Sequence, residues 1–235
     1  MTGPARSLAF FSPATAAHGL LRGGATLLFE GGASRSLDTA ARIREDADGV
    51  RAMVPDRLDL LWAPLSEPVE LGGSLVHVCR VTGAVASRRI DCLGTASEDR
   101  EPPRWTELDA LRRVSALWDP RTALLLAARR PRFALGHGQE RVEAWLLHDG
   151  ALERVDQARL STVYDGRGRH RTAGLELWRE DEDLPRRASG TAVAGSSLEL
   201  DGLRVEAAVF AWSMNGREGF GGYEITARES SGDAA

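Results

Sequence analysis

Short apolar segments that alternate with polar residues recur along the whole sequence, and Gly- or Asp-containing turn signals separate them. This two-residue period is typical of β-strands with one buried face. Several such strands at short spacing predict an all-β barrel or sandwich. The segments that fit are ATLLF (25–29), LDLLW (58–62), SLVHVCRV (74–81), VEAWLL (142–147), GLELW (174–178), LRVEAAVFAW (203–212) and YEITA (223–227).

One segment, TELDALRRVSALW (106–118), fits two structures. Thr106 and Asp109 have the spacing of a helix capping box, and apolar residues recur every three positions after them. The same segment could instead be a strand that turns at DPR into TALLLAARR. We favour the pair of strands.

A charged, proline-containing stretch around 97–105 (SEDREPPRW) predicts a linker. We therefore expect an N-terminal β module over 1–98, a linker over 99–107, a C-terminal β module over 108–228 and a disordered tail over 229–235. The two halves contain similar strand sequences in the same order. ATLLF, LDLLW and RVTGAV (80–85) in the first half resemble TALLLA (122–127), LELW and RASGTAV (187–193) in the second. Either the halves are two copies of one module, or β proteins simply reuse similar strands.

The glycine-rich stretch NGREGFGGYEITAR (215–228) could bind phosphate or form a turn. A phosphate loop needs a helix after it, whose free N–H groups face the anion. Here a β-rich segment follows. Asn215-Gly216 between alternating strands instead predicts a hairpin, and Gly219, Gly221 and Gly222 predict a bulge or a close backbone approach.

Composition excludes several classes of function. The net charge of −4 gives no basic field for nucleic acid. All 30 basic residues are arginine, so Schiff-base, pyridoxal-phosphate and P-loop lysine chemistry are excluded. The two cysteines, Cys79 and Cys92, fit a reducing compartment, and the five histidines form no tight ligand pair. We expect a cytoplasmic protein with no membrane span, no cofactor and no metal.

Carboxylates within strands are the candidates for chemistry. Such a residue usually marks the solvated face of a strand. Glu176, however, shares a face with Trp178, and a carboxylic acid walled by aromatic rings gains a raised pKa and can act as a general acid. His77 alternates with apolar neighbours, which favours a hydrogen-bonded interior histidine over a catalytic one.

Three stretches carry a family resemblance: RVTGAVASRRIDCLG (80–94), ARLSTVYDGRGRHRTAGLELW (158–178) and VFAWSMNGREGFGGYEI (209–225). Together they resemble actinobacterial proteins of unassigned function that are distantly similar to the carotenoid 1,2-hydratase (hydroxyneurosporene synthase) type. The resemblance implies two lipocalin-like modules in tandem. The relatives often carry a histidine after a GLG-like turn, whereas this chain has GTASEDREPPRW there.

Three hypotheses for function follow. The first is binding of a hydrophobic small molecule, isoprenoid- or polyketide-like, in an apolar barrel cavity. The second is a cofactor-free hydratase or cyclase that protonates an alkene with a buried carboxylic acid. The third is a non-catalytic interaction module. The expected site residues are Glu176, Asp91 and Tyr164 for catalysis, and Trp178, Trp212, Trp62 and His77 for ligand binding.

Overall fold

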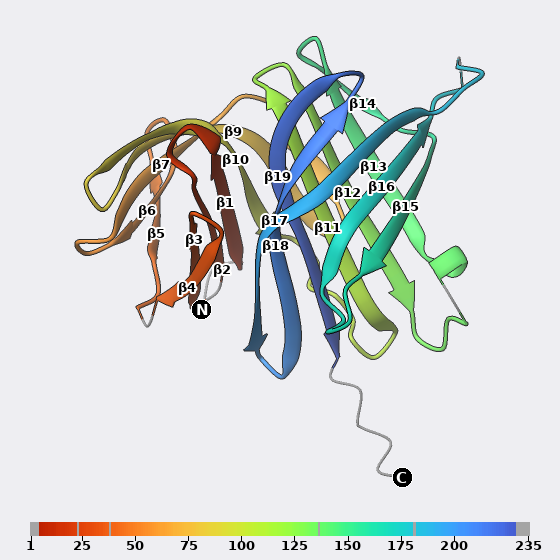
Figure 1. Ribbon diagram of the computed structural model, residues 1–235, viewed down its shortest axis with the longest axis horizontal. Helices are drawn as coiled ribbons and strands as arrows, with labels where there is room; N and C mark the ends of the chain where they lie inside the picture. The colour runs from red at the N-terminus through yellow and green to blue at the C-terminus, as the bar shows by residue number, and fades with distance from the viewer. Residues whose placement is uncertain (1–4, 23, 38, 136, 181, 229–235) are drawn as a thin grey trace.

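The computed structural model describes residues 5–22, 24–37, 39–135, 137–180 and 182–228. These residues form two curled antiparallel sheets, one from each half of the chain, and contain no α-helix (Figure 1). The all-β prediction and the tandem of two lipocalin-like halves are therefore confirmed. The expected tail over 229–235 lies outside the described residues. No helix in the described ranges is long and apolar enough to cross a membrane.

The N-terminal sheet has ten strands. They are β1 (Arg6–Ser12), β2 (Ala17–Arg22), β3 (Ala25–Glu30), β4 (Ala33–Leu37), β5 (Arg42–Asp46), β6 (Gly49–Val54), β7 (Leu58–Pro64), β8 (Val69–Leu71), β9 (Ser74–Val85) and β10 (Arg88–Asp99). A 3-10 turn, η1 (Pro13–Thr15), joins β1 to β2.

The C-terminal sheet has nine strands. They are β11 (Leu108–Asp119), β12 (Thr122–Pro131), β13 (Arg141–His148), β14 (Ala151–Arg154), β15 (Gln157–Tyr164), β16 (His170–Trp178), β17 (Arg186–Leu200), β18 (Leu203–Met214) and β19 (Arg217–Arg228). A second 3-10 turn, η2 (His137–Gln139), precedes β13. The ambiguous segment 106–118 thus contributes to β11, so the strand interpretation is confirmed.

The two sheets have the same strand order. It is β4-β3-β2-β1-β10-β9-β7-β6-β5 in the first and β14-β13-β12-β11-β19-β18-β17-β16-β15 in the second. In both halves the last strand therefore pairs with the first, at the middle of the sheet. The N-terminal half adds β8, which pairs with β9 outside this path. The shared order favours the interpretation that the halves are two copies of one module.

The segments matched between the halves are, however, displaced by one strand. ATLLF lies in β3, whose counterpart by strand order is β13, whereas TALLLA lies in β12. LDLLW lies in β7 and LELW in β16; RVTGAV lies in β9 and RASGTAV in β17. The individual matches were wrong, because alternating strands of similar composition resemble one another whether or not they are equivalent.

The glycine-rich stretch is a hairpin, as predicted. β18 turns into β19 at Asn215 and Gly216, which both have positive φ, 52° and 74°. Further along β19, a Cβ on Gly221 would overlap the carbonyl oxygen of Ser115. These glycines therefore permit the close approach of two backbones and leave no phosphate site.

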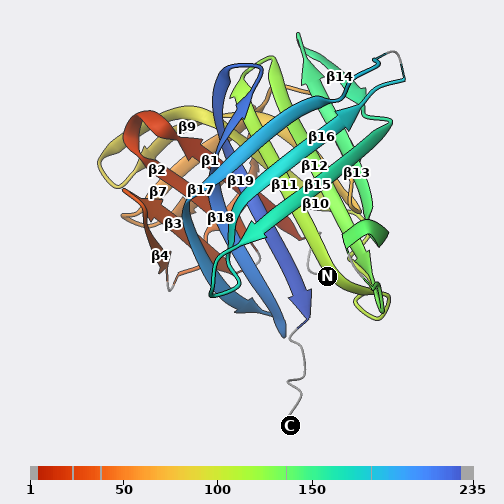
Figure 2. The same cartoon turned by 45° about the vertical axis from the view of Figure 1, so that its right-hand side comes forward.

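Three apolar cores hold the fold together. One fills the N-terminal half-barrel around Phe10 and Trp62, and one fills the C-terminal half-barrel around Phe210, Trp212 and Tyr223. The third lies between the sheets and takes side chains from both halves. Figures 1 and 2 show the two sheets side by side, with β1 and β2 close to β18 and β19. The central strands are therefore buried on both faces.

A candidate ligand site between the two sheets

An apolar cavity of about 100 Å³ lies between the two sheets. Strand alternation selects its lining, because in β11 the odd-numbered residues face the other sheet and the even-numbered ones face the C-terminal half-barrel. The same rule applies on the opposite wall in β1. The apolar part of the lining includes Ala9, Phe11, Leu20, Leu71, Val76 and Leu125.

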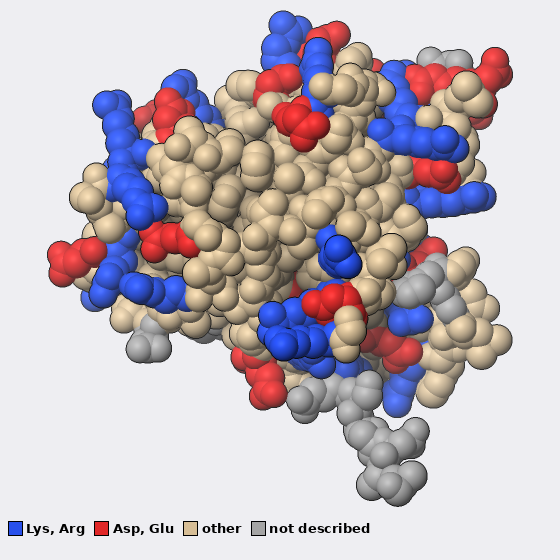
Figure 3. Space-filling view, viewed as in Figure 1, with Lys and Arg blue, Asp and Glu red and all other residues tan. Residues whose placement is uncertain are grey.

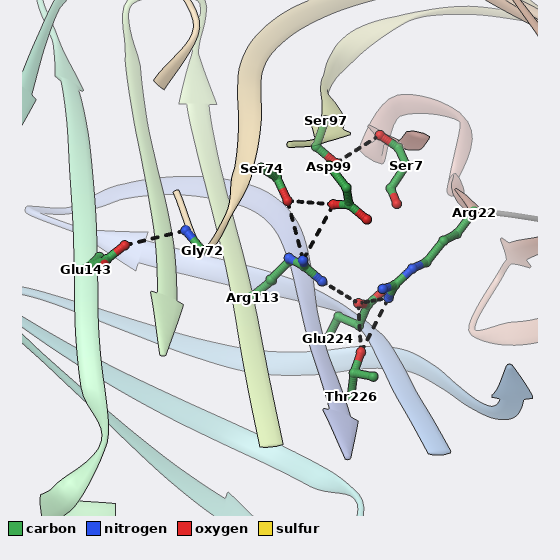
Figure 4. Close-up of polar contacts among 10 residues, drawn as sticks. All are labelled: Ser7, Arg22, Gly72, Ser74, Ser97, Asp99, Arg113, Glu143, Glu224 and Thr226. Atoms are coloured by element: carbon green, nitrogen blue, oxygen red, sulfur yellow. Dashed lines mark hydrogen bonds and ion pairs between the residues drawn. The ribbon is translucent and has the colours of Figure 1, made fainter. Parts of the chain in front are cut away.

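One end of this cavity is charged. Arg113 of β11, Glu224 of β19 and Arg22 of β2 line it, and their side chains converge in Figure 4. Arg22 donates a short hydrogen bond to Glu224 and a second one, of 3.3 Å, to the hydroxyl of Thr226. The Thr226 hydroxyl in turn donates to Glu224 Oε1 at 3.2 Å. Glu224 therefore joins the two halves of the protein through an ion pair.

Arg113 is bound more loosely. Its Nη2 donates to Ser74 Oγ over 3.4 Å, and its ionic contacts with Glu224 Oε1 and Asp99 Oδ1 are 3.7 and 3.8 Å long. Ser74 donates to the same Asp99 oxygen over 2.6 Å. Burial lowers the pKa of the Arg113 guanidinium, while Glu224 acts in the opposite direction. An arginine remains a cation throughout the physiological range.

A narrower cavity of about 20 Å³ adjoins the first. The two share three lining residues, Leu20, Arg22 and Glu224. The smaller one continues between Leu27 of the N-terminal sheet and Val205 and Ala207 of the C-terminal sheet. The Arg22–Glu224 ion pair thus stands between two apolar compartments.

The residues predicted for catalysis lie on the surface. Glu176 has a 36% exposed side chain and pairs with Arg187 over 3.2 Å. Asp91 accepts two hydrogen bonds from Arg80, which lower the pKa of its carboxyl group. Tyr164 is exposed at the end of β15. Their catalytic roles stay predictions, and none of the three lines the inter-sheet cavity.

The residues predicted for ligand binding are spread over four places. Trp178 packs under the guanidinium of Arg159 at the outer face of β16. Trp62 and Trp212 are buried inside different half-barrels, and the Trp62 indole donates to the carbonyl oxygen of Ala9 over 2.8 Å. The ring nitrogen Nδ1 of His77 contacts the carbonyl oxygen of Ser66 at 3.2 Å. The structure does not bring these residues together.

Two further observations concern the cysteines and metal binding. Cys79 and Cys92 are free thiols on the paired strands β9 and β10, and burial raises the pKa of each to about 12, which makes both poor nucleophiles. Among the described residues, no group of three or more metal-binding side chains comes together.

The cavity residues could have been suspected from one feature of the sequence. Arg112 and Arg113 stand side by side within the apolar segment ALRRVSAL (110–117), which is an unusual place for two charges. In a strand they must point to opposite faces. The contribution of Arg22, Asp99 and Glu224 depends on how the halves pack, which no local pattern shows.

The fold and cavity define a tandem half-barrel protein with an apolar site between its halves. No protein-family model and no curated protein matches the sequence. Among solved structures, a protein of Nitrosomonas europaea assigned as AttH superposes with a TM-score of 0.62 at 14% identity, over 95% of this chain and 91% of that one.

Two further structures share the fold. Kievitone hydratase from Nectria haematococca superposes with a TM-score of 0.62 at 11% identity, over 96% of this chain and 89% of that one. CghA superposes with a TM-score of 0.60 at 12% identity, over 98% of this chain and 89% of that one. At such low identity the likeness establishes the fold alone.

Proposed function

We propose that the protein binds a hydrophobic small molecule, of isoprenoid or polyketide type, in the cavity between its sheets. The observation that carries this proposal is the cavity itself, an apolar space with charged and hydroxyl groups at one end. Apolar walls with a few polar groups are typical of small-molecule sites. The site differs from our sequence-based hypothesis in position, because this cavity lies between the two sheets and not inside a half-barrel.

The volume limits the part of the ligand that the cavity can hold. An apolar cavity of ~150 Å³ accepts benzene, so about 100 Å³ fits a compact apolar group. A longer chain would extend past Leu20 into the adjoining compartment. Leu20 is partly exposed and lies at the boundary, so its rotation would join the two spaces.

A hydratase or cyclase is the second candidate. It is favoured by a carboxyl group, Glu224, at the wall of an apolar cavity, and one protein of the same fold is a hydratase. Alkene protonation requires a protonated acid. Glu224 instead contacts the guanidinium groups of both Arg22 and Arg113. We therefore rank binding ahead of catalysis.

An interaction module is the weakest of the three. The large apolar side chains that are exposed lie in five separate parts of the described chain: Leu65, Phe133 and Leu135, Val163 and Tyr164, Leu184, and Val193. Figure 3 shows charged residues around the edge of one face and uncharged residues across its middle. Most of the β17 segment exposed there is Ala, Gly, Ser and Thr, which offers little apolar surface to a partner.

Native mass spectrometry of the protein purified from its own host, followed by denaturing extraction, tests the proposal. We expect a co-purifying hydrophobic compound in the wild type and its loss in Val76→Phe, which fills the cavity. Leu65→Phe makes the same kind of change at an exposed position outside the cavity and should retain the compound. Retention by Val76→Phe would place the ligand elsewhere. Conversion of the extracted compound by fresh protein would favour the enzyme.

A further inference from the structure

We propose that the ligand of the inter-sheet cavity is an amphipathic monoanion whose acidic head group, a carboxylate in the simplest case, binds the guanidinium of Arg113. This inference rests on the proposed function and deepens it by naming the chemical class of the ligand.

The hydrogen-bonding capacity of Arg113 is largely unused within the described residues. A guanidinium has five N–H donors. Arg113 has one long hydrogen bond, of 3.4 Å to Ser74, and its two ionic contacts of 3.7 and 3.8 Å exceed hydrogen-bonding distance. The group is 23% exposed, and burial already disfavours its charge. A closer partner would therefore be strongly favoured.

The neighbouring carboxylates already have closer donors. Glu224 Oε1 accepts from Arg22 and from Thr226. Asp99 Oδ1 accepts from Ser74 over 2.6 Å. To move closer to Arg113, either carboxylate would have to weaken those bonds. Among the charged side chains that line the cavity, Arg113 is therefore the one that is free to recognise something else.

The balance of charge favours an anion. The guanidinium groups of Arg22 and Arg129 and the carboxylates of Glu224 and Asp99 act electrostatically on Arg113, so that three positive charges, with its own, stand against two negative ones. One positive charge is in excess. A singly charged anion neutralises it, whereas a neutral ligand or a water molecule satisfies donors without doing so.

Shape completes the argument. A carboxylate can accept two parallel hydrogen bonds from the planar guanidinium fork. From that position the rest of the molecule would lie against the apolar lining, between Phe11 and Leu20 on one sheet and Leu125 on the other. Head and tail of a fatty or isoprenoid acid thus meet complementary surfaces in one space.

Matched probes test this directly. Binding of butanoate, hexanoate, octanoate and decanoate is compared by titration calorimetry with that of the alcohols of the same chain lengths. We expect the acid of a given length to bind at least about tenfold more tightly than its alcohol, because charge-assisted hydrogen bonds are the stronger ones. The preference should shrink as salt is raised, and the affinity for the alcohol should not.

Three variants locate the effect. Arg113→Met should abolish the preference for acids and leave alcohol binding in place. Arg113→Lys keeps the charge without the fork and should retain part of the preference; it also serves if the methionine variant fails to fold. Arg80→Gln removes an exposed arginine outside the cavity and should behave as wild type.

Equal affinities of acids and alcohols for the wild type, or a preference that survives in Arg113→Met, would overturn the head-group inference while leaving hydrophobic binding intact. If the wild type bound neither series at any length, the proposed function itself would fail, and this inference with it.

Discussion

Arg112 and Arg113 are consecutive residues of β11 whose guanidinium groups lie on opposite sides of the C-terminal sheet. Arg113 lines the cavity between the sheets. Arg112 lies inside the C-terminal half-barrel, where it pairs with Glu140 and donates to Thr162 and Tyr223 over 3.1 Å each. One strand thus carries both a charge at the wall of the inter-sheet cavity and a charge enclosed in a core.

The enclosed pair predicts a strong effect on stability. The side chains of Arg112 and Glu140 are 3% and 1% exposed. Arg112→Met would remove the guanidinium that pairs with this buried carboxylate, at a cost of ~3–5 kcal/mol in the free energy of unfolding. Urea denaturation measures it. The double variant Arg112→Met/Glu140→Leu should recover much of the loss, since an apolar pair needs no compensation; an equally unstable double variant would contradict this account.

A side chain introduced at Gly221 should also lower stability, because it would meet the backbone of a neighbouring strand. A Cβ at this position would overlap the carbonyl oxygen of Ser115 on the neighbouring strand. Gly221→Ala must push β11 and β19 apart, and we expect a loss of ~1–3 kcal/mol or more in thermal or urea unfolding. Gly166→Ala is the control, because that Cβ would meet open space. Equal stability of the two variants would show that the strands yield easily.

We expect the buried His18 to make the stability of the protein depend on pH. It is buried between the halves, stacked on Phe220 with ring centroids 5.6 Å apart, and burial lowers its pKa from 6.5 to about 4. The unfolded chain therefore takes up the proton first as pH falls. His18 should cost stability progressively between pH 6.5 and about 4 and have no such effect above that range.

Urea midpoints at pH 4.5 and 7.5 check the sign of this effect. The drop in midpoint on acidification should be smaller in His18→Phe than in the wild type, since phenylalanine cannot take up a proton. His148→Phe is a suitable control, because His148 lies at an exposed position. An unchanged acid sensitivity in His18→Phe would assign the effect to other groups.

We expect a substitution of Glu176 to have little effect on stability or ligand binding. Its side chain is partly exposed and pairs with Arg187, which is 73% exposed. Exposed ion pairs contribute little to stability, so Glu176→Gln should change the free energy of unfolding by less than ~1 kcal/mol. The extracted ligand and its affinity should also be unchanged. A large loss of binding or turnover would restore Glu176 as the candidate acid and move the site to the outer face of β16.

The sequence contained the information for the architecture but only part of that for the site. Alternation and the Asn215-Gly216 hairpin identify strands because both depend on neighbouring residues. Equivalence between the halves was harder to find. Segments such as LELW and LDLLW look alike but lie one position apart in the shared strand order. The composition of a strand does not depend on its place in the sheet, so the likeness was misleading.

The site could not be found in the same way. Glu176 and Trp178 were candidates because they share one face of one strand, but that face proved to be the outer one. Arg22, Arg113 and Glu224 come from β2, β11 and β19 and meet only when the two sheets pack. Their juxtaposition is a tertiary property that no spacing along the chain expresses.

The pairing of the first and last strand in each half has a consequence for how the chain may be connected. Arg6 near the start of β1 lies opposite Glu98 near the end of β10, and Ala110 near the start of β11 lies opposite Ala227 near the end of β19. A circular permutant could therefore begin at β11, pass from β19 to β1 through a new loop and finish at β10. Every strand would keep its neighbours. The order in which a ribosome makes the two halves is then exchangeable, although both are needed to enclose the cavity.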